Sequence, residues 1–195
     1  MSSVLLIGSR SSRMSVLNRT LTEFGYQVLA RVEPAEDLME VASCYSPDLL
    51  VIGLDQPDPS LLESLSYLNK VSPLPVVMFV EQTSENIVQQ AIRSGVNAYI
   101  VADLQPQRVK TIIDVAVARF QEYQSLREEL EQTKTRLEDR KLLDKAKGLL
   151  MEKQGISENQ AYKKLRKLAM DKGESLPVVA RQVIEVMTLL EEKAL

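Results

Sequence analysis

The sequence predicts an α/β domain followed by an all-α domain, and two observations carry that prediction. In residues 1–118, five short apolar runs alternate with segments of helical length, as expected of a parallel sheet with helices on both faces. After residue 118 these runs stop and strong helix-forming residues dominate. We therefore expect a doubly wound (βα)5 domain, a long linker helix at 119–138 and a three-helix domain at 139–195.

The five expected strands are apolar runs of strand length, several of them bounded by Gly, Pro or Asp. Between them, apolar residues recur at helical spacing, as at Leu61, Leu65 and Leu68. Gly25 and Gly95 stand where helix C-caps are expected. The strands are expected at residues 4–7, 26–30, 49–52, 76–79 and 98–101.

The linker is expected to be one continuous helix, because residues 109–143 contain neither Gly nor Pro. A heptad stripe along it favours a short, imperfect coiled coil between two copies of the chain. A single solvated helix is the alternative. The stripe consists of Phe120, Tyr123, Leu130 and Leu137, with Arg127, Lys134 and Lys141 at the intervening a positions.

The segment after the linker divides into three helical stretches. Gly155 and Gly173 separate them, so that the first ends near residue 154 and the others cover 157–172 and 175–190. Their apolar stripes are expected to form one small core. The stripe residues are Ala146, Leu149, Leu150, Ala161, Leu165, Leu168, Ala169, Leu176, Val179, Ala180, Val183 and Ile184.

The composition limits the possible functions. Of the 195 residues, 45% are apolar and 26% charged, as in a folded globular protein. No apolar run reaches the roughly 18 residues of a membrane span and no signal peptide begins the sequence, so we expect a cytoplasmic protein.

Histidine is absent, which removes His-based zinc sites and Ser-His or Cys-His nucleophiles. Cys44, the single cysteine, is expected to be a buried apolar residue. We expect that the protein is not an enzyme and that it binds neither a metal ion nor a cofactor.

Charge is unevenly distributed along the chain. The net charge is −5 over residues 1–118, −1 over 119–138 and +3 over 139–195, and it reaches +6 within 140–172. A basic block at one end of an acidic protein suggests an anion-binding module. A solvated helical face is the alternative explanation.

Residues 3–118 resemble a response-regulator receiver domain, which has a flavodoxin-like fold. The resemblance lies in the segment SPDLLV at 46–51, which enters the third expected strand, and in AIRSGVNAY at 91–99, which enters the fifth. Receiver domains accept a phosphoryl group on an aspartate after the third strand. An acidic pair holds Mg²⁺ there, and a Thr or Ser and a Lys ligate the phosphate.

The phosphorylation residues are missing from the corresponding positions. Gly8 and Ser9 stand in place of the acidic pair, Gly53 in place of the phosphoacceptor, Val80 in place of the Thr or Ser and Ala102 in place of the Lys. Asp55 is the nearest carboxylate, and we do not expect it to be phosphorylated. The resemblance therefore indicates a pseudoreceiver, kept for its shape and surfaces.

Residues 139–183 are similar to the ANTAR domain in the order and spacing of their motif residues. Joined to a receiver-like domain by a helical linker, the whole resembles the NasT-type regulators of nitrate and nitrite assimilation, with the amidase regulators as more distant relatives. The matching residues are Asp139-Arg140, Ala146 to Met151, Gly155 to Glu158, Ala161-Tyr162, Leu165-Arg166, Ala169-Met170, Leu176, Val179-Ala180 and Val183-Ile184.

This resemblance implies a transcription antiterminator that binds RNA. ANTAR proteins bind paired stem-loops in a nascent leader and prevent a downstream terminator from forming. The family also implies control by a soluble nitrate/nitrite sensor (NasS-like) that binds the regulator and releases it. The residues expected to contact RNA are Arg140, Lys147, Lys163, Arg166 and Lys167, with Tyr162 as the only aromatic side chain of the module.

Two other classes of protein remain compatible with the sequence. A DNA-binding response regulator would need a recognition helix, and the basic block contains no recognisable helix-turn-helix motif. An interaction scaffold would need no nucleic acid at all. In that case the basic residues would be solvated, and Tyr162 would lie at the edge of the small core.

Overall fold

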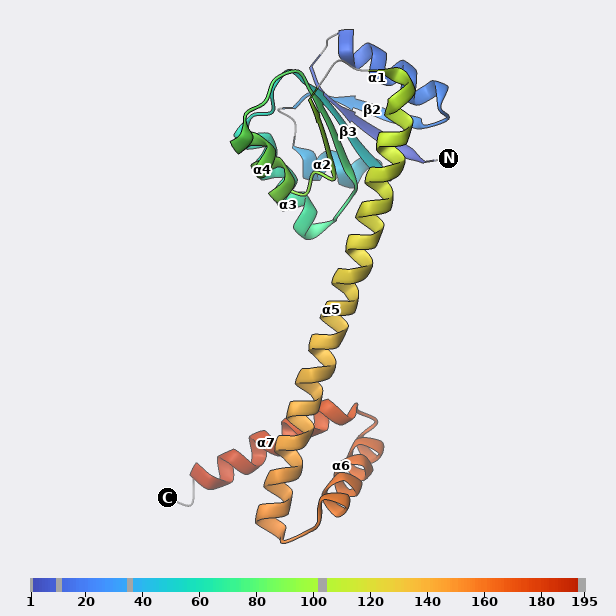
Figure 1. Cartoon of the computed structure of the whole chain (residues 1–195). Helices are drawn as coiled ribbons and strands as arrows, with labels where there is room; N and C mark the ends of the chain where they lie inside the picture. Colours follow the sequence, from blue (N-terminus) through green and yellow to red (C-terminus); the bar gives the residue numbers. More distant parts are fainter. Residues whose placement is uncertain (1, 10–11, 35–36, 102–104, 193–195) are drawn as a thin grey trace. The chain divides into compact units, whose positions relative to one another are not determined.

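The computed structural model describes residues 2–9, 12–34, 37–101 and 105–192, with side chains as far as Thr188 (Figure 1). The chain forms two compact units, Met1–Gln124 and Ser125–Leu195, and helix α5 begins in the first and ends in the second. Each helix of the described residues is too short or too polar to span a membrane.

The first unit contains a five-stranded parallel sheet in the order β2-β1-β3-β4-β5. This confirms the predicted doubly wound (βα)5 domain, and every expected strand is present with its ends moved by at most two residues. The elements are β1 (Ser3–Ile7), α1 (Ser12–Glu23), β2 (Gln27–Val32), α2 (Leu38–Tyr45), β3 (Leu49–Leu54), α3 (Pro59–Val71), β4 (Val76–Val80), α4 (Glu85–Arg93), β5 (Ala98–Val101) and α5 (Pro106–Gln154).

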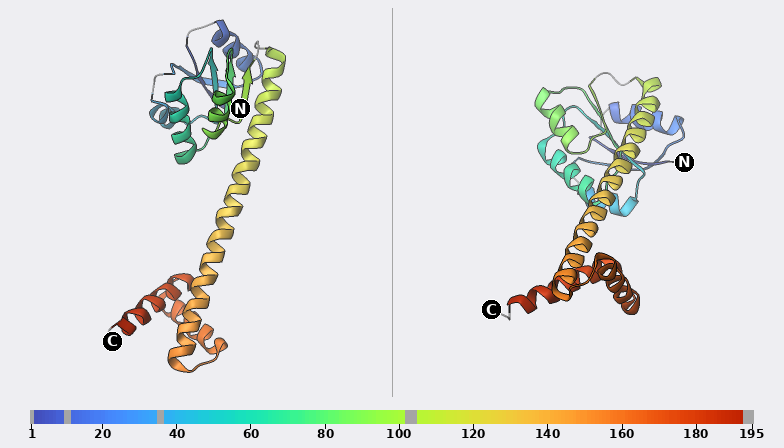
Figure 2. Two further views of the ribbon diagram at one scale, coloured as in Figure 1. Left: turned by 60° about the vertical axis from the view of Figure 1, so that its left-hand side comes forward. Right: turned by 60° about the horizontal axis from the view of Figure 1, so that its bottom comes forward.

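Helices cover both faces of this sheet (Figure 2). Alternate strand residues point to opposite faces, so Leu5 and Ile7 of β1 pack with α2, α3 and α4. Val4 and Leu6 of the same strand pack with α1 and the first turns of α5. Every residue of β3 and β4 is buried, as expected of central strands in a sheet covered on both sides.

One local prediction in this unit is wrong. Cys44 was expected to be buried, but it is exposed on α2. The buried face of α2 is formed by Leu38 and Ala42, and Cys44 lies two residues beyond Ala42, which places it on the opposite side of the helix. The apolar character of a residue does not by itself tell on which face of a helix it lies.

The second unit is built from the end of α5, α6 (Glu158–Lys172) and α7 (Leu176–Glu192). Ser157 caps α6 in a capping box with Gln160, which satisfies two backbone N–H groups that the helix leaves free. Gly155 and Gly173 have φ of +61° and +65°, a left-handed conformation that glycine adopts without strain. These residues therefore form the two turns that the sequence predicts.

The predicted small core joins these three helices. Its buried centre consists of Ala146, Leu150, Ala161, Leu165, Ala169, Val179 and Ala180. Two predicted members do not belong to this cluster: Leu168 is exposed, and Leu149 is only partly buried. Leu142 and Leu143 pack against the cluster and extend the apolar face of α5.

Candidate nucleic-acid interface

Helix α6 turns its small apolar residues inward and its basic residues outward. Ala161, Leu165 and Ala169 recur every four residues and are buried against α5 and α7. The intervening positions are exposed, and they include four residues that the sequence predicts to contact RNA. These are Tyr162, Lys163, Arg166 and Lys167.

The three cations of this group are available to a ligand. The side chains of these residues form no ion pair or hydrogen bond with any residue in the described ranges. They are Lys163, Arg166 and Lys167. Arg140 is also open: its side chain is 82% exposed, and its Nε lies 3.9 Å from Oδ2 of Asp144, at the outer limit of an ion pair. These exposed side chains can exchange water for contacts with an anion.

Lys147 is placed differently from the other predicted cations. Its Nζ lies 2.7 Å from Oδ1 of Asp144 and 2.7 Å from Oε1 of Glu158, and its side chain is only 15% exposed. Hydrogen bonds to Asp144 and Glu158 raise the pKa of Lys147. The hydrogen bond from Lys147 in turn lowers the pKa of Asp144. Lys147 therefore joins α5 to the first turn of α6.

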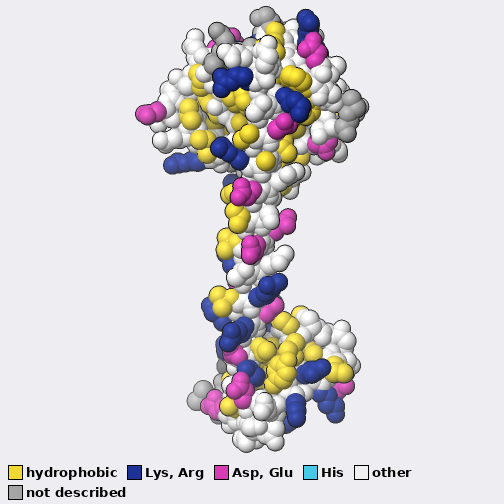
Figure 3. All heavy atoms as spheres, turned by 45° about the vertical axis from the view of Figure 1, so that its right-hand side comes forward, with side chains coloured by type: hydrophobic (Ala, Val, Ile, Leu, Met, Phe, Trp, Pro, Cys, Tyr) yellow, Lys and Arg dark blue, Asp and Glu magenta, His cyan; other side chains and the backbone are white. Residues whose placement is uncertain are grey.

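Three further side chains of the second unit are exposed, although they are not among the expected RNA contacts. Lys141 and Lys145 are exposed on α5 and pair with no carboxylate among the described residues. Met170 on α6 is 73% exposed, although it lies beside the buried Ala169. Figure 3 shows hydrophobic and Lys or Arg side chains gathered on one face of the second unit. Helical spacing from the buried alanines was the signal that could have identified these outward positions.

The phosphorylation position of the first unit is closed by packing. A Cβ added to Gly53 would lie 2.7 Å from Cδ1 of Leu17 and 3.1 Å from Sδ of Met14, and one added to Gly8 would collide with the carbonyl oxygen of Gly53. Val80, at the Thr or Ser position, is completely buried. The ends of the Met14 and Leu17 side chains on α1 therefore lie against the Cβ position of a phosphoacceptor and would have to shift to admit one.

The remaining residues of that edge offer no replacement for the missing groups. Asp55 is exposed, and its carbonyl oxygen accepts hydrogen bonds from the backbone N–H groups of Glu81 and Gln82. The predicted Lys position, Ala102, lies outside the described residues. Within those residues, no group of three His, Cys, Asp or Glu side chains could hold a metal ion.

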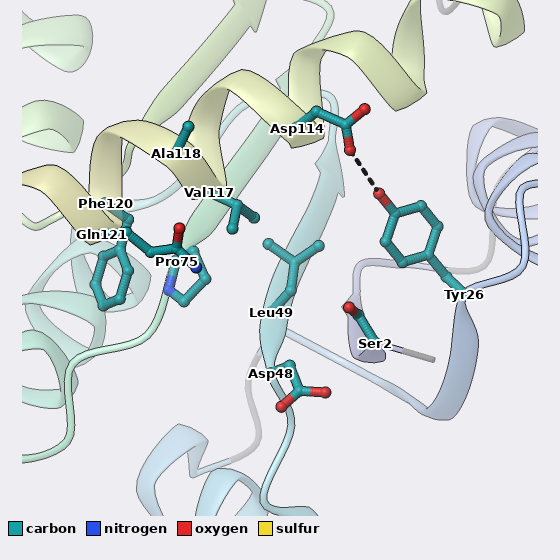
Figure 4. A pocket seen from close by; sticks show the side chains of 10 residues that line it. All are labelled: Ser2, Tyr26, Asp48, Leu49, Pro75, Asp114, Val117, Ala118, Phe120 and Gln121. Carbon is teal, nitrogen blue, oxygen red and sulfur yellow. Dashed lines mark hydrogen bonds between the residues drawn. The ribbon is translucent and has the colours of Figure 1, made fainter.

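A pocket of about 520 Å³ lies at the opposite edge of the sheet, beside α5 (Figure 4). The phenol of Tyr26 donates to Oδ1 of Asp114 over 3.3 Å. Asp48 accepts hydrogen bonds from the backbone nitrogen and the hydroxyl of Ser3, both at 2.8 Å, and the first of these lowers the pKa of Asp48. Both carboxylates are thus hydrogen-bonded within the chain, and none of the described side chains that line the pocket is a cation.

The architecture defines a regulator composed of a receiver domain and a helical output domain. A model of the response regulator receiver domain matches residues 4–114, and one of the ANTAR domain matches residues 131–184. The chain is 30% identical over 171 residues to the transcriptional regulatory protein PdtaR of Mycobacterium tuberculosis, covering 88% of this chain and 83% of that protein. The chain therefore belongs to the ANTAR-domain response regulators, as its motifs predict.

Two further similarities are narrower. The chain is 40% identical over 80 residues to the nitrate regulatory protein of Klebsiella oxytoca, which covers 41% of this chain and 20% of that protein. Its fold is similar to the signal receiver domain of a modulated diguanylate cyclase from Desulfovibrio desulfuricans G20. The TM-score is 0.54 at 18% identity, covering 62% of this chain and 97% of that one, so this likeness concerns the fold alone.

Proposed function

We propose that this protein binds paired stem-loops in a nascent leader RNA and prevents the downstream terminator from forming, so that transcription continues. The observation that carries the proposal is the set of exposed cations on α6, Lys163, Arg166 and Lys167, which pair with no described carboxylate. They lie inside the region that matches the ANTAR domain. The name of PdtaR, a transcriptional regulatory protein, supports a role in gene expression.

The chemistry of the outward face of α6 suits RNA. Cations that contact phosphates release condensed counterions, and this release gives binding its salt dependence. Lys163 and Lys167 are four residues apart, about 6 Å along the helix axis, so both can follow one stretch of backbone. Tyr162 is 40% exposed and offers part of its ring to an unstacked loop base.

We assign Lys147 a different task within the same site. Phosphate would have to displace two carboxylates that already contact its Nζ at 2.7 Å. Lys147 instead fixes the start of α6 relative to α5, and so holds the cations of α6 in place. Arg140, Lys163, Arg166 and Lys167 then form the direct phosphate contacts.

Control by a protein partner fits this chain better than control by phosphorylation. Gly53 supplies no carboxylate, and the ends of the Met14 and Leu17 side chains pack where the Cβ of a phosphoacceptor would lie. Similarity to a protein named nitrate regulatory protein supports nitrate or nitrite as the signal. The proposed partner is a NasS-like sensor that binds the regulator until the signal releases it.

The proposed organisation is a pseudoreceiver at 1–118, a linker at 119–138 and an ANTAR domain at 139–195, in the cytoplasm where nascent RNA is made. Tyr123, Leu130 and Leu137 are each more than half exposed on the linker. This apolar stripe supports a homodimer through α5, because a second copy would remove it from water.

Single-round transcription tests this function. The template carries two short-loop hairpins followed by a terminator, and the protein is added before elongation. We expect full-length transcript to increase with protein concentration on this template, and to stay constant when both loops are scrambled. Equal termination with and without the protein would refute the proposal.

A further inference from the structure

The pocket of about 520 Å³ beside α5 lies at the amino ends of the parallel strands (Figure 4). Among the residues that line it, four immediately precede a strand of the sheet: Ser2, Tyr26, Asp48 and Pro75. Ligands of parallel α/β sheets usually bind at the carboxyl ends of the strands, so this pocket is separate from the edge where receiver domains are phosphorylated. Its volume falls within the range of small-molecule sites.

Neither the proposed RNA contacts nor the proposed homodimer contact uses this pocket. The residues that line it lie in the first unit, whereas the cations of α6 lie in the second. The exposed stripe of α5 begins at Tyr123, which does not line the pocket. Phe120, the first residue of the predicted stripe, is partly buried and lines the pocket instead. The pocket is therefore open to a ligand of its own.

The middle of the pocket is apolar. Leu49 is 1% exposed, Pro75 is buried, and Val117 of α5 is packed against the core. An aliphatic chain that lies on these side chains removes apolar surface from water, which favours its binding.

Two carboxylates border this apolar surface. Figure 4 shows Asp114 and Asp48 on opposite sides of Leu49. The backbone nitrogen and the hydroxyl of Ser3 both donate to Oδ2 of Asp48 at 2.8 Å, and these hydrogen bonds lower the pKa of Asp48. Among the described residues, none donates a hydrogen bond to its Oδ1. Asp48 therefore carries a negative charge at neutral pH and has an oxygen to offer to a cation.

Asp114 is held only by long contacts. The phenol of Tyr26 donates to its Oδ1 over 3.3 Å, and Nζ of Lys110 lies 3.3 Å from its Oδ2. The Lys110 side chain is 51% exposed and does not line the pocket. An exposed ion pair of this kind contributes little to stability, so a second ammonium group can compete for Asp114.

We propose that this pocket binds a linear aliphatic diamine. One ammonium group donates to Asp48 and the other to Asp114, and the methylene chain lies on Leu49 and Val117 between them. A metal ion matches the pocket less well, since the described residues hold no group of three side chains that could ligate one. An anion would meet two carboxylates and no cation among the described lining residues.

Titration calorimetry of the full-length protein with 1,4-diaminobutane tests the site. We expect one molecule to bind per chain, with Asp48→Asn and Asp114→Asn each at least about tenfold weaker, because each removes a charge-assisted hydrogen bond. Asparagine keeps an oxygen that accepts from Ser3 or Tyr26, so both variants should fold. Glu63→Gln removes an equal charge from an exposed position on α3 that does not line the pocket, and it is the matched control.

Two further measurements separate a built site from a diffuse acidic surface. Ala118→Phe adds a ring at an exposed position that lines the pocket and leaves every charge in place, so it should abolish binding while thermal unfolding stays that of the wild type. Butylamine, which has one ammonium group, should bind at least about tenfold more weakly than the diamine.

Three outcomes would overturn the proposal. The first is the absence of saturable binding by the wild type. The second is an equal loss of affinity in Glu63→Gln and Asp48→Asn, which would show that only the net charge attracts the diamine. The third is equal affinity for butylamine, which would show that the pocket takes a single ammonium group, such as a lysine of a partner protein.

Discussion

Nζ of Lys147 lies 2.7 Å from Oε1 of Glu158, eleven residues further along the chain. The contact crosses the turn between α5 and α6, and Asp144 completes it from the preceding turn of α5. Because one cation serves two carboxylates on two helices, this group fixes where α6 begins. Lys147 therefore differs from the exposed cations of α6, which pair with no described carboxylate.

Replacing Lys147 by Met should lower the melting temperature of the protein. Methionine keeps most of the aliphatic stem but leaves Asp144 and Glu158 without their cation. We expect a loss of about 1 kcal/mol in the free energy of unfolding, the upper range for an exposed ion pair, measured by circular dichroism. The salt slope of RNA binding should stay that of the wild type, and a slope reduced by one phosphate contact would contradict the positioning role.

The effect of Lys147→Met should depend on pH in a defined direction. The pKa of Asp144 is lowered, so its contribution is present above the unfolded value of about 3.9 and is lost as pH falls through the folded pKa. The pKa of Lys147 is raised, so its contribution is present below about 10.4 and is lost as pH rises further. The difference in melting temperature should therefore be constant near neutral pH and shrink below about pH 4.

Arg166→Ala should weaken RNA binding and reduce its salt dependence. With four phosphate contacts, the plot of log affinity against log salt has a slope of about −3 for single-stranded RNA, and each lost contact reduces it by about 0.7. Helicity should not change, because Arg166 is exposed and does not belong to the hydrophobic cluster of the second unit. Arg93→Ala on α4 is the matched control. Equal affinity and slope for the two variants would remove Arg166 from the site.

Two substitutions of Tyr162 distinguish a role in base stacking from a packing role at the edge of the core. Tyr162→Phe keeps the ring, whereas Tyr162→Ala removes it and should cost about 1–3 kcal/mol of RNA binding if a base stacks there. Fluorescence anisotropy gives the affinities and thermal unfolding gives the stabilities. A loss of stability in Tyr162→Ala with unchanged affinity would assign the ring to packing.

Acetyl phosphate with Mg²⁺ should not label this protein, even after a carboxylate is restored. Gly53→Asp places its Cβ 2.7 Å from Cδ1 of Leu17 and 3.1 Å from Sδ of Met14, so these two side-chain ends must shift to admit it. We expect no phosphoryl incorporation, because Gly8, Ser9 and Val80 still stand in place of the Mg²⁺ and phosphate ligands. Mass spectrometry of the intact protein measures the labelling. Stable incorporation at Asp55 in the wild type would show that the first unit still works as a phosphorylated receiver.

Periodicity explains why the fold was predictable. Continuous apolar runs such as 76–80 are typical of strands buried on both faces, and their alternation with helical stripes leaves few arrangements besides a parallel sheet. Gly155 and Gly173 marked the turns of the second unit because both require a left-handed backbone. In each of these cases the local conformational preference of the residues agrees with the fold that they adopt.

The site was less predictable, because it depends on contacts between segments far apart in sequence. The sequence alone does not distinguish Lys147 from the other cations of the second unit. Its contact with Glu158 arises only when the turn between α5 and α6 brings the two residues together. Gly53 showed that the phosphoacceptor is missing, but not that Met14 fills its place. The apolar stripe of α6 predicts that Leu168 belongs to the core, but Leu168 is exposed in the structure.

The measurement that tests the central claim most directly is a competition gel shift with the full-length protein. The labelled RNA carries two short-loop hairpins, and the competitors are the same RNA with scrambled loops and a duplex DNA of equal length. We predict that unlabelled hairpin RNA displaces the complex at concentrations at least about tenfold below either competitor, as expected when loop bases contribute to recognition. Equal displacement by all three would contradict the claim that this protein recognises RNA stem-loops.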